Sequence, residues 1–86
     1  MKVKAYAKFR GFYRKLPKAI RRKALRQIRK LSKNSRHPSL RVKKIQGTAD
    51  IWEARIDLHY RMTFEIVDDT IFLRVIGHHD EALKNP

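Results

Sequence analysis

The second half of the chain alternates apolar and polar residues with a period of two, which is typical of β-strands that bury one face. Turn signals separate the alternating segments, one around residues 57–59 and one at the Asp68–Asp69 pair. Short strands joined by such turns form antiparallel meanders. The segments that carry the alternation are residues 52–56, 60–67 and 71–76.

The first half instead follows spacings of three and four residues, which predict helices. Residues 2–8 predict a short opening strand, and a second helix begins at Pro17, because proline suits a first helical turn. The apolar positions are Phe9, Phe12, Tyr13 and Leu16 in the first helix, Ile20, Ala24, Ile28 and Leu31 in the second, and Leu40, Val42 and Ile45 in a strand that follows.

These elements predict an α+β fold in the order β-α-α-β-β-β-β, with a helical hairpin packed on an antiparallel sheet. A chain of 86 residues has room for one core, so we expect a single domain over residues 1–86. One core also accounts for the apolar residues, which favours a monomer.

The turn positions predict which residues face each other across the strands. The expected pairs are Trp52–Phe64, Ala54–Met62, Arg55–Arg61, Phe64–Leu73, Met62–Val75 and Thr63–Arg74. In this register Arg55, Arg61 and Arg74 converge on the face away from the helices. Two interpretations remain open: a phosphate site, because arginine forks suit phosphate oxygens, or a ladder of charges offset by Glu53 and Glu65.

Charge is divided very unequally along the chain. Residues 1–44 contain ten Lys, eight Arg and no acidic residue, and the whole chain has a net charge of +14. So much like charge repels itself, and nucleic acid or an acidic protein would relieve the repulsion. A merely solvated or heat-adapted surface is the alternative, but residues 1–44 lack the acids that thermophile ion-pair networks need.

Several classes of protein are excluded by what the sequence lacks. There is no cysteine, which excludes disulfides, cysteine zinc sites, iron–sulfur clusters and thiol nucleophiles. No apolar run is long enough to cross a membrane, and the N-terminus lacks a signal-peptide core, so we expect a cytoplasmic protein. A glycine-rich phosphate loop, a serine nucleophile elbow and a paired-carboxylate motif are also missing.

Four histidines offer candidate chemistry. His37 and His59 lie in expected turns, whereas His78 and His79 follow the last strand together. Imidazole can give or take a proton near neutral pH, and Asp80 could orient one of the rings. A polar strand end without a role is the alternative. We expect no metal site, because His78, His79 and Asp80 are consecutive and no second ligand motif accompanies them.

The chain resembles the RelE/ParE superfamily of toxins from bacterial and archaeal toxin–antitoxin systems, nearest to the RelE/YoeB ribonuclease branch. The resemblance covers nearly all of residues 1–83 and implies the same fold. The segments that carry it are Lys44–Gly47, Asp50–Ile56, His59–Phe64, Val67–Asp69 and Val75–His79.

The resemblance implies a ribosome-dependent endoribonuclease that cuts messenger RNA and thereby inhibits translation. In that reaction the 2′-OH attacks the adjacent phosphate and leaves a 2′,3′-cyclic phosphate and a 5′-OH, without a metal or cofactor. The matching positions imply that Arg61 and Arg55 bind the phosphate and that His79 is the general acid or base, with His78 as its substitute. The residues that would meet RNA are Arg41, Lys43, Lys44, Arg74, Arg22, Arg26 and Arg29.

The chain also departs from the family pattern. Glu53 replaces a lysine of RelE and is either a general base or a silencing substitution, and the C-terminal tyrosine of many members is absent. A ParE-like inhibitor of DNA gyrase and a catalytically silent RNA-binding module therefore remain alternatives. The implied partners are the ribosome, messenger RNA and a cognate acidic antitoxin, and free of antitoxin the chain is expected to be a monomer.

Overall fold

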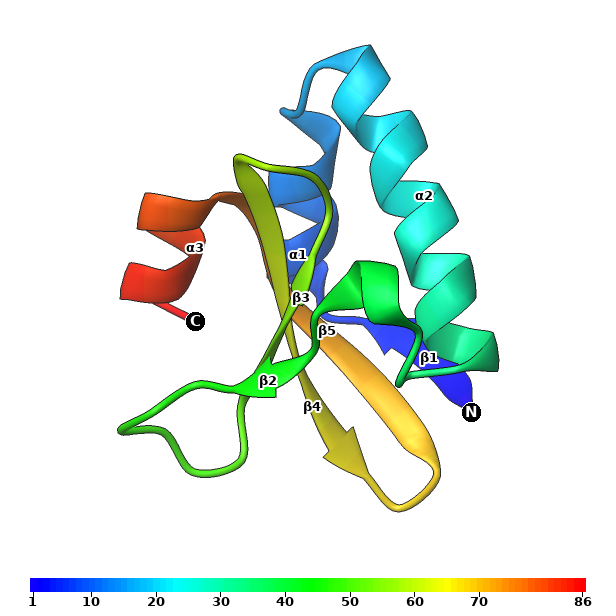
Figure 1. Cartoon of the computed structure of the whole chain (residues 1–86). Coiled ribbons are helices and arrows are strands. Elements are labelled where there is room, and N and C mark those ends of the chain that lie inside the picture. The colour runs from blue at the N-terminus through cyan, green and yellow to red at the C-terminus, as the bar shows by residue number, and fades with distance from the viewer.

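The structure, a computed structural model, describes all of residues 1–86 and has helices on both sides of one sheet (Figure 1). In chain order the elements are β1 (Lys2–Ala5), α1 (Ala7–Arg14), α2 (Lys18–Lys33), the 3₁₀ turn η1 (Pro38–Leu40), β2 (Lys43–Lys44), β3 (Trp52–Arg55), β4 (Tyr60–Val67), β5 (Thr70–His78) and α3 (His79–Lys84).

The five strands form one sheet in the order β1-β5-β4-β3-β2. Neighbours from β2 to β5 are antiparallel, as the meander predicted, whereas β1 runs parallel to β5. The α+β class and the helical hairpin are confirmed. The expectation of a purely antiparallel sheet is wrong at β1, because most of the chain separates β1 from β5 and a connection that long permits parallel pairing.

The predicted register holds between β3 and β4 and changes partway along β5. Trp52 faces Phe64 and Arg55 faces Arg61, as expected. Between β4 and β5, Phe64 faces Leu73, but a β-bulge follows and the expected Thr63–Arg74 and Met62–Val75 pairs are wrong. Thr63 instead faces Val75, which leaves Arg74 as the unpaired extra residue. The alternation of apolar and polar residues could not reveal the bulge, because Val75 and Ile76 are both apolar and either one could face the core.

The hairpin of α1 and α2 covers one face of the sheet and closes the main core. Phe9 of α1 and Ala24 and Leu31 of α2 are buried, together with Met62 and Phe64 of β4. Ile20 and Ile28, from the same predicted stripe, pack against this cluster while half-buried. No helix of the chain has both the length and the apolar character that crossing a bilayer requires.

The segment between the hairpin and β3 is less regular than predicted. Pro38–Leu40 forms a 3₁₀ turn, and Arg41 follows in the left-handed region at φ 46°. A residue in that region cannot continue a strand, so the expected strand shrinks to Lys43–Lys44. Leu40 is fully buried nonetheless, so it anchors this connection to the core.

α3 was not predicted and covers part of the sheet face opposite the hairpin (Figure 1). Ala82 of α3 and Thr63 of β4 are both fully buried. The Thr63 hydroxyl donates to the Pro86 carbonyl at 3.0 Å and accepts from the Val75 N–H at 3.1 Å. A helix of six residues that follows a strand directly gives too short a periodic signal to detect.

A polar network joins the start of α1 to the open part of the sheet. The Tyr6 hydroxyl donates to Glu65 Oε1 at 2.6 Å, and Arg74 Nη1 donates to the same oxygen at 2.9 Å. The Tyr6 ring also stacks on Phe72 with 5.5 Å between centroids. The Tyr6 hydrogen bond, aided by Arg74 and against the effect of burial, lowers the pKa of Glu65, and the same hydrogen bond raises the pKa of Tyr6.

Replacing Glu65 with Gln should lower stability at neutral pH and have little effect in acid. Because the pKa of Glu65 is lower in the folded state, its ionised form stabilises the fold above the unfolded-state pKa, and this contribution is lost as pH falls through the folded-state value. The side chain is 27% exposed, so we expect only about 0.5–1 kcal/mol at pH 7. Urea unfolding at pH 7 and pH 3 measures the loss in unfolding free energy, with Asp68→Asn in the exposed β4–β5 turn as the control. If Glu65→Gln lowered the unfolding free energy as much at pH 3 as at pH 7, the ionised Glu65 would not be the source of this stabilisation.

Replacing Ala82 with Glu should undock α3. The Ala82 side chain is fully buried, so a carboxylate there must either be buried without a partner or expel the helix. We expect a loss of about 1–3 kcal/mol in unfolding free energy, together with faster amide exchange over residues 79–85. Glu81→Ala, at the exposed neighbouring position, is the matched control and should change neither. Unchanged exchange in Ala82→Glu would mean that α3 is not held by this contact.

Candidate active site

Two of the three predicted arginines lie side by side where β3 and β4 meet their connecting turn. Arg55 and Arg61 are direct partners in the register. Both side chains donate hydrogen bonds to backbone carbonyls at the turn. Arg55 Nε donates to the Asp57 carbonyl at 3.2 Å. Arg61 Nη1 donates to the same carbonyl at 2.7 Å and to the Tyr60 carbonyl at 3.0 Å. The Nη atoms of Arg55 and Nη2 of Arg61 make no hydrogen bond within the chain. The pair is thus oriented by the protein and keeps donors free for an anion.

Gln27, which the sequence did not identify as a functional residue, helps to hold this pair in place. Gln27 is buried on α2, and its Nε2 donates to the Arg55 carbonyl at 2.8 Å and to the Ser39 carbonyl at 3.3 Å. This amide fixes the end of β3 against the helical hairpin. A polar residue within an apolar helical stripe was the only available signal for Gln27.

Asp57 shapes the turn itself. Its Oδ1 accepts the N–H groups of His59 at 2.9 Å and Tyr60 at 3.0 Å, and its Oδ2 pairs with Lys23 at 3.3 Å. Burial works to raise the pKa of Asp57, but these hydrogen bonds and Lys23 outweigh it, so the pKa lies below its usual range. The ionised carboxylate therefore orders the turn whose carbonyls orient Arg55 and Arg61.

Glu53 lies on the same sheet face as the arginine pair. It is 7% exposed, and its Oε1 is 3.9 Å from Arg61 Nε. Arg61 therefore has a carboxylate beside it and not the lysine that the resemblance would have supplied. The geometry is compatible with both interpretations of Glu53, because the same carboxylate can accept a proton or partly neutralise Arg61.

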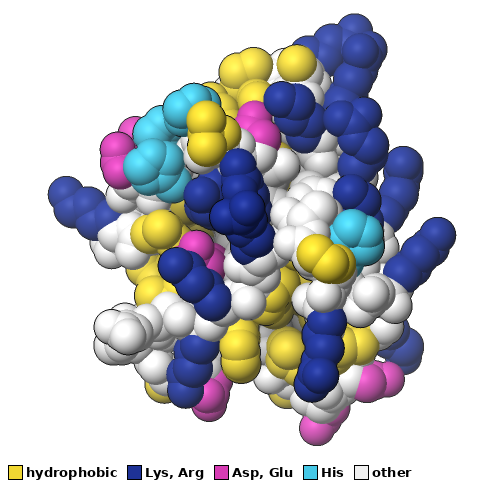
Figure 2. Space-filling view, viewed as in Figure 1, with side chains coloured by type: hydrophobic (Ala, Val, Ile, Leu, Met, Phe, Trp, Pro, Cys, Tyr) yellow, Lys and Arg dark blue, Asp and Glu magenta, His cyan; other side chains and the backbone are white.

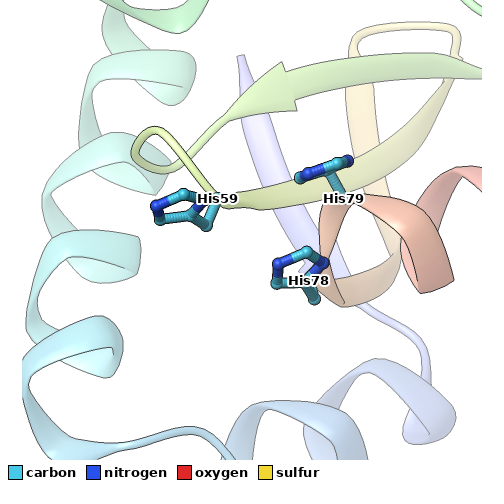
Figure 3. Close-up of side chains that lie close together, drawn as sticks. All are labelled: His59, His78 and His79. Carbon is cyan, nitrogen blue, oxygen red and sulfur yellow. The ribbon is translucent and has the colours of Figure 1, made fainter.

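Three of the four histidines gather next to this turn (Figure 3). His78 ends β5, His79 begins α3, and His59 belongs to the β3–β4 turn. The His79 N–H donates to the His59 carbonyl at 2.8 Å, which ties the start of α3 to the turn. Asp80 Oδ1 lies 2.9 Å from His79 Nδ1, as the sequence suggested. The strand register could have placed His59 here, since the end of β5 falls beside the β3–β4 turn.

Arg74 does not join Arg55 and Arg61. It occupies the bulge, where its Nε donates to the Pro86 carbonyl at 3.0 Å and its Nη1 to Glu65 at 2.9 Å. For this arginine the structure matches the charge-ladder interpretation, with Glu65 as the offsetting acid. The expected convergence is therefore limited to two arginines.

The remaining basic residues form a broad surface around the site, and Figure 2 shows dark blue side chains along α2. Arg22, Arg26 and Arg29 are exposed on this helix, whereas Lys44 pairs with Asp50 at 3.2 Å. Between α2, η1 and β3 runs a groove of about 590 Å³, and its basic lining residues are Lys23, Arg26, Lys30, Arg41 and Arg55. The groove thus leads from the basic helix to Arg55.

Comparisons with known proteins agree with this architecture. The family model of the ParE-like toxin domain matches residues 18–80. No curated protein matches the sequence significantly.

Solved structures share the fold at low sequence identity. A chain of the archaeal RelE–RelB complex from Pyrococcus horikoshii OT3 is 24% identical, with a TM-score of 0.75 over 94% of this chain and 97% of that one. YafQ from Escherichia coli BL21(DE3) is 10% identical, with a TM-score of 0.78 over 93% and 94%. The YoeB/ParE toxin from Agrobacterium tumefaciens is 15% identical, with a TM-score of 0.77 over 92% and 99%. The family model spans well over half of the sequence, and the protein therefore belongs to the ParE-like toxin domain family.

Proposed function

We propose that the protein is the toxin of a toxin–antitoxin system and acts as a ribosome-dependent endoribonuclease on messenger RNA in the cytoplasm. The observation that carries this proposal is the pairing of Arg55 and Arg61 at the same end of the sheet as His79. Both arginines are preoriented by turn carbonyls and retain free donors. A gyrase-binding toxin has no need of such a constellation.

The proposed reaction assigns a role to each group. The RNA 2′-oxygen forms a bond to the adjacent phosphorus as the bond to the 5′-oxygen breaks, which leaves a 2′,3′-cyclic phosphate and a 5′-OH. Arg55 and Arg61 stabilise the charge on the phosphorane. Glu53 removes the 2′-OH proton, and His79 protonates the leaving 5′-oxygen, with Asp80 orienting its imidazole. This route needs no metal, because the proton transfers and the two guanidiniums supply the catalysis.

The basic surface supports binding to the ribosome. Residues 1–44 carry all but four of the chain's lysines and arginines. Such a surface attracts phosphate backbone regardless of sequence and releases its counterions on binding. The groove between α2 and β3 would lead RNA toward Arg55. The residues proposed to contact RNA are Arg22, Arg26, Arg29, Arg41, Lys43 and Lys44.

We also propose a cognate acidic antitoxin. The solved relatives include a RelE–RelB complex from Pyrococcus horikoshii and an antitoxin–toxin complex from Methanococcus jannaschii. A net charge of +14 gives an acidic segment a strong electrostatic reason to bind here. The free toxin would be a monomer.

Inhibition of DNA gyrase is the second candidate, because the matching family model is that of the ParE-like toxin domain. Gyrase inhibition would leave messages intact and damage DNA. Mapping of message ends therefore separates the two functions.

Inducing the protein in a bacterial host should create new messenger RNA 5′ ends inside translated codons. Arg61→Ala should reduce cleavage by about 100-fold or more, because it removes a charge aimed at the transition state. Primer extension measures the ends. Arg14→Ala, which removes one exposed guanidinium at the end of α1, is the matched control and should cleave normally. Growth arrest with intact messages would overturn the ribonuclease proposal and favour gyrase.

Glu53→Gln should reduce cleavage by about 100-fold if the carboxylate is the base, since the amide cannot take the 2′-OH proton. Primer extension on ribosomes programmed with one message compares the variants directly. Asp68→Asn, an exposed acid in the β4–β5 turn, is the control. Faster cleavage by Glu53→Gln would instead identify Glu53 as a group that attenuates Arg61.

A further inference from the structure

Three imidazoles from two distant parts of the chain meet at one corner of the molecule (Figure 3). The ligand nitrogens of His59, His78 and His79 all lie within 4.8 Å of one another. The rings of His78 and His79 are 4.5 Å apart between centroids, and those of His59 and His78 are 6.0 Å apart. The consecutive pair at residues 78 and 79 therefore has the separate third ligand that the sequence did not reveal.

The backbone holds this arrangement together from two directions. The His79 N–H donates to the His59 carbonyl at 2.8 Å, and Tyr60, next to His59, is the register partner of His78. The edge of the Tyr60 ring also packs against His78, with 5.9 Å between centroids. The three Cα positions are thus fixed, while each side chain remains accessible enough to rotate: His59 is exposed and the other two are half-buried.

We propose that His59, His78 and His79 bind a transition-metal ion of the Zn²⁺ class, with water completing the coordination. Imidazole nitrogen is a preferred ligand for zinc, copper and nickel, and three histidines plus water make an open tetrahedral site. With Zn–N bonds of about 2.05 Å, ligand nitrogens in such a site are about 3.3 Å apart. The nitrogens lie within 4.8 Å of one another, so metal binding requires the exposed His59 ring to rotate toward the other two.

Asp80 supplies the support that a metal-binding histidine needs. Its Oδ1 lies 2.9 Å from His79 Nδ1, and its Oδ2 lies 3.7 Å from His78 Nδ1. A carboxylate that accepts the Nδ1 hydrogen leaves the lone pair of His79 on Nε2, which is then the nitrogen available to a metal ion. Asp80 also provides local negative charge in a chain whose net charge of +14 otherwise repels cations. Hard cations such as Mg²⁺ should not bind, because they prefer oxygen ligands.

The site has a consequence for activity that rests on the proposed function. A metal ion bound to His79 would occupy the imidazole that is proposed to protonate the leaving oxygen. It would also clamp α3 to the β3–β4 turn. Zinc would then be a reversible inhibitor of cleavage and not a cofactor. Metal binding itself can be measured on the free protein without ribosomes, so its outcome is independent of whether the chain cuts RNA.

The experiment titrates Zn²⁺ into the purified untagged full chain by calorimetry and follows Co²⁺ by its visible absorption. We expect one site per chain, intense tetrahedral Co²⁺ bands and a rise in Tm of about 5 °C or more at saturating Zn²⁺. His59→Gln should weaken binding by at least about tenfold, because it removes one of three ligands. His37→Gln, which alters the one histidine outside the cluster, is the matched control and should bind normally.

Three results would overturn the proposal. They are the absence of saturable Zn²⁺ binding, equal binding by the unmodified chain and His59→Gln, and a response to Mg²⁺ equal to that to Zn²⁺. Circular dichroism of each apo variant establishes that it is folded, so that weakened binding by His59→Gln reports the lost ligand. If zinc binds as expected and the chain cuts no RNA, the metal site stands and the ribonuclease proposal fails.

Discussion

The pairing of β4 with β5 is the constraint on which the rest of the molecule depends. These are the two longest strands, with eight and nine residues, and they form the centre of the sheet. β1 extends the sheet beside β5, β3 extends it beside β4, the hairpin covers one face and α3 covers the other. The end of this strand pair also determines the site, because the β3–β4 turn and the β5–α3 junction meet there.

The charges on α1 and α2 do little to stabilise these helices, so their stability must come from packing. Neither α1 nor α2 has an acidic residue in its first turn, so the partial positive charge at each helix N-terminus is not complemented. The basic side chains of α2 also repel one another along its exposed face. The helices therefore hold their positions through Phe9, Ala24 and Leu31, and the polar surface is left free to serve binding.

The sequence predicted features that follow from local periodicity and missed those that depend on contacts between distant segments. Alternation and the turn at residues 57–59 were enough to pair Arg55 with Arg61 correctly. They could not show that Arg74 occupies a bulge and binds Glu65, because a single extra residue leaves the pattern intact. Likewise, Gln27 and His59 matter through partners far along the chain, and neither the polar position of Gln27 in an apolar stripe nor the turn position of His59 identified those partners.

The two outer strands of the sheet have a consequence for how the protein behaves at high concentration. β1 has four residues and β2 only two. β1 carries Lys2 and Lys4, and β2 consists of Lys43 and Lys44. Exposed strand edges are templates for aggregation unless they are short or charged, and these edges are both. The free chain can therefore reach a high concentration without polymerising edge to edge.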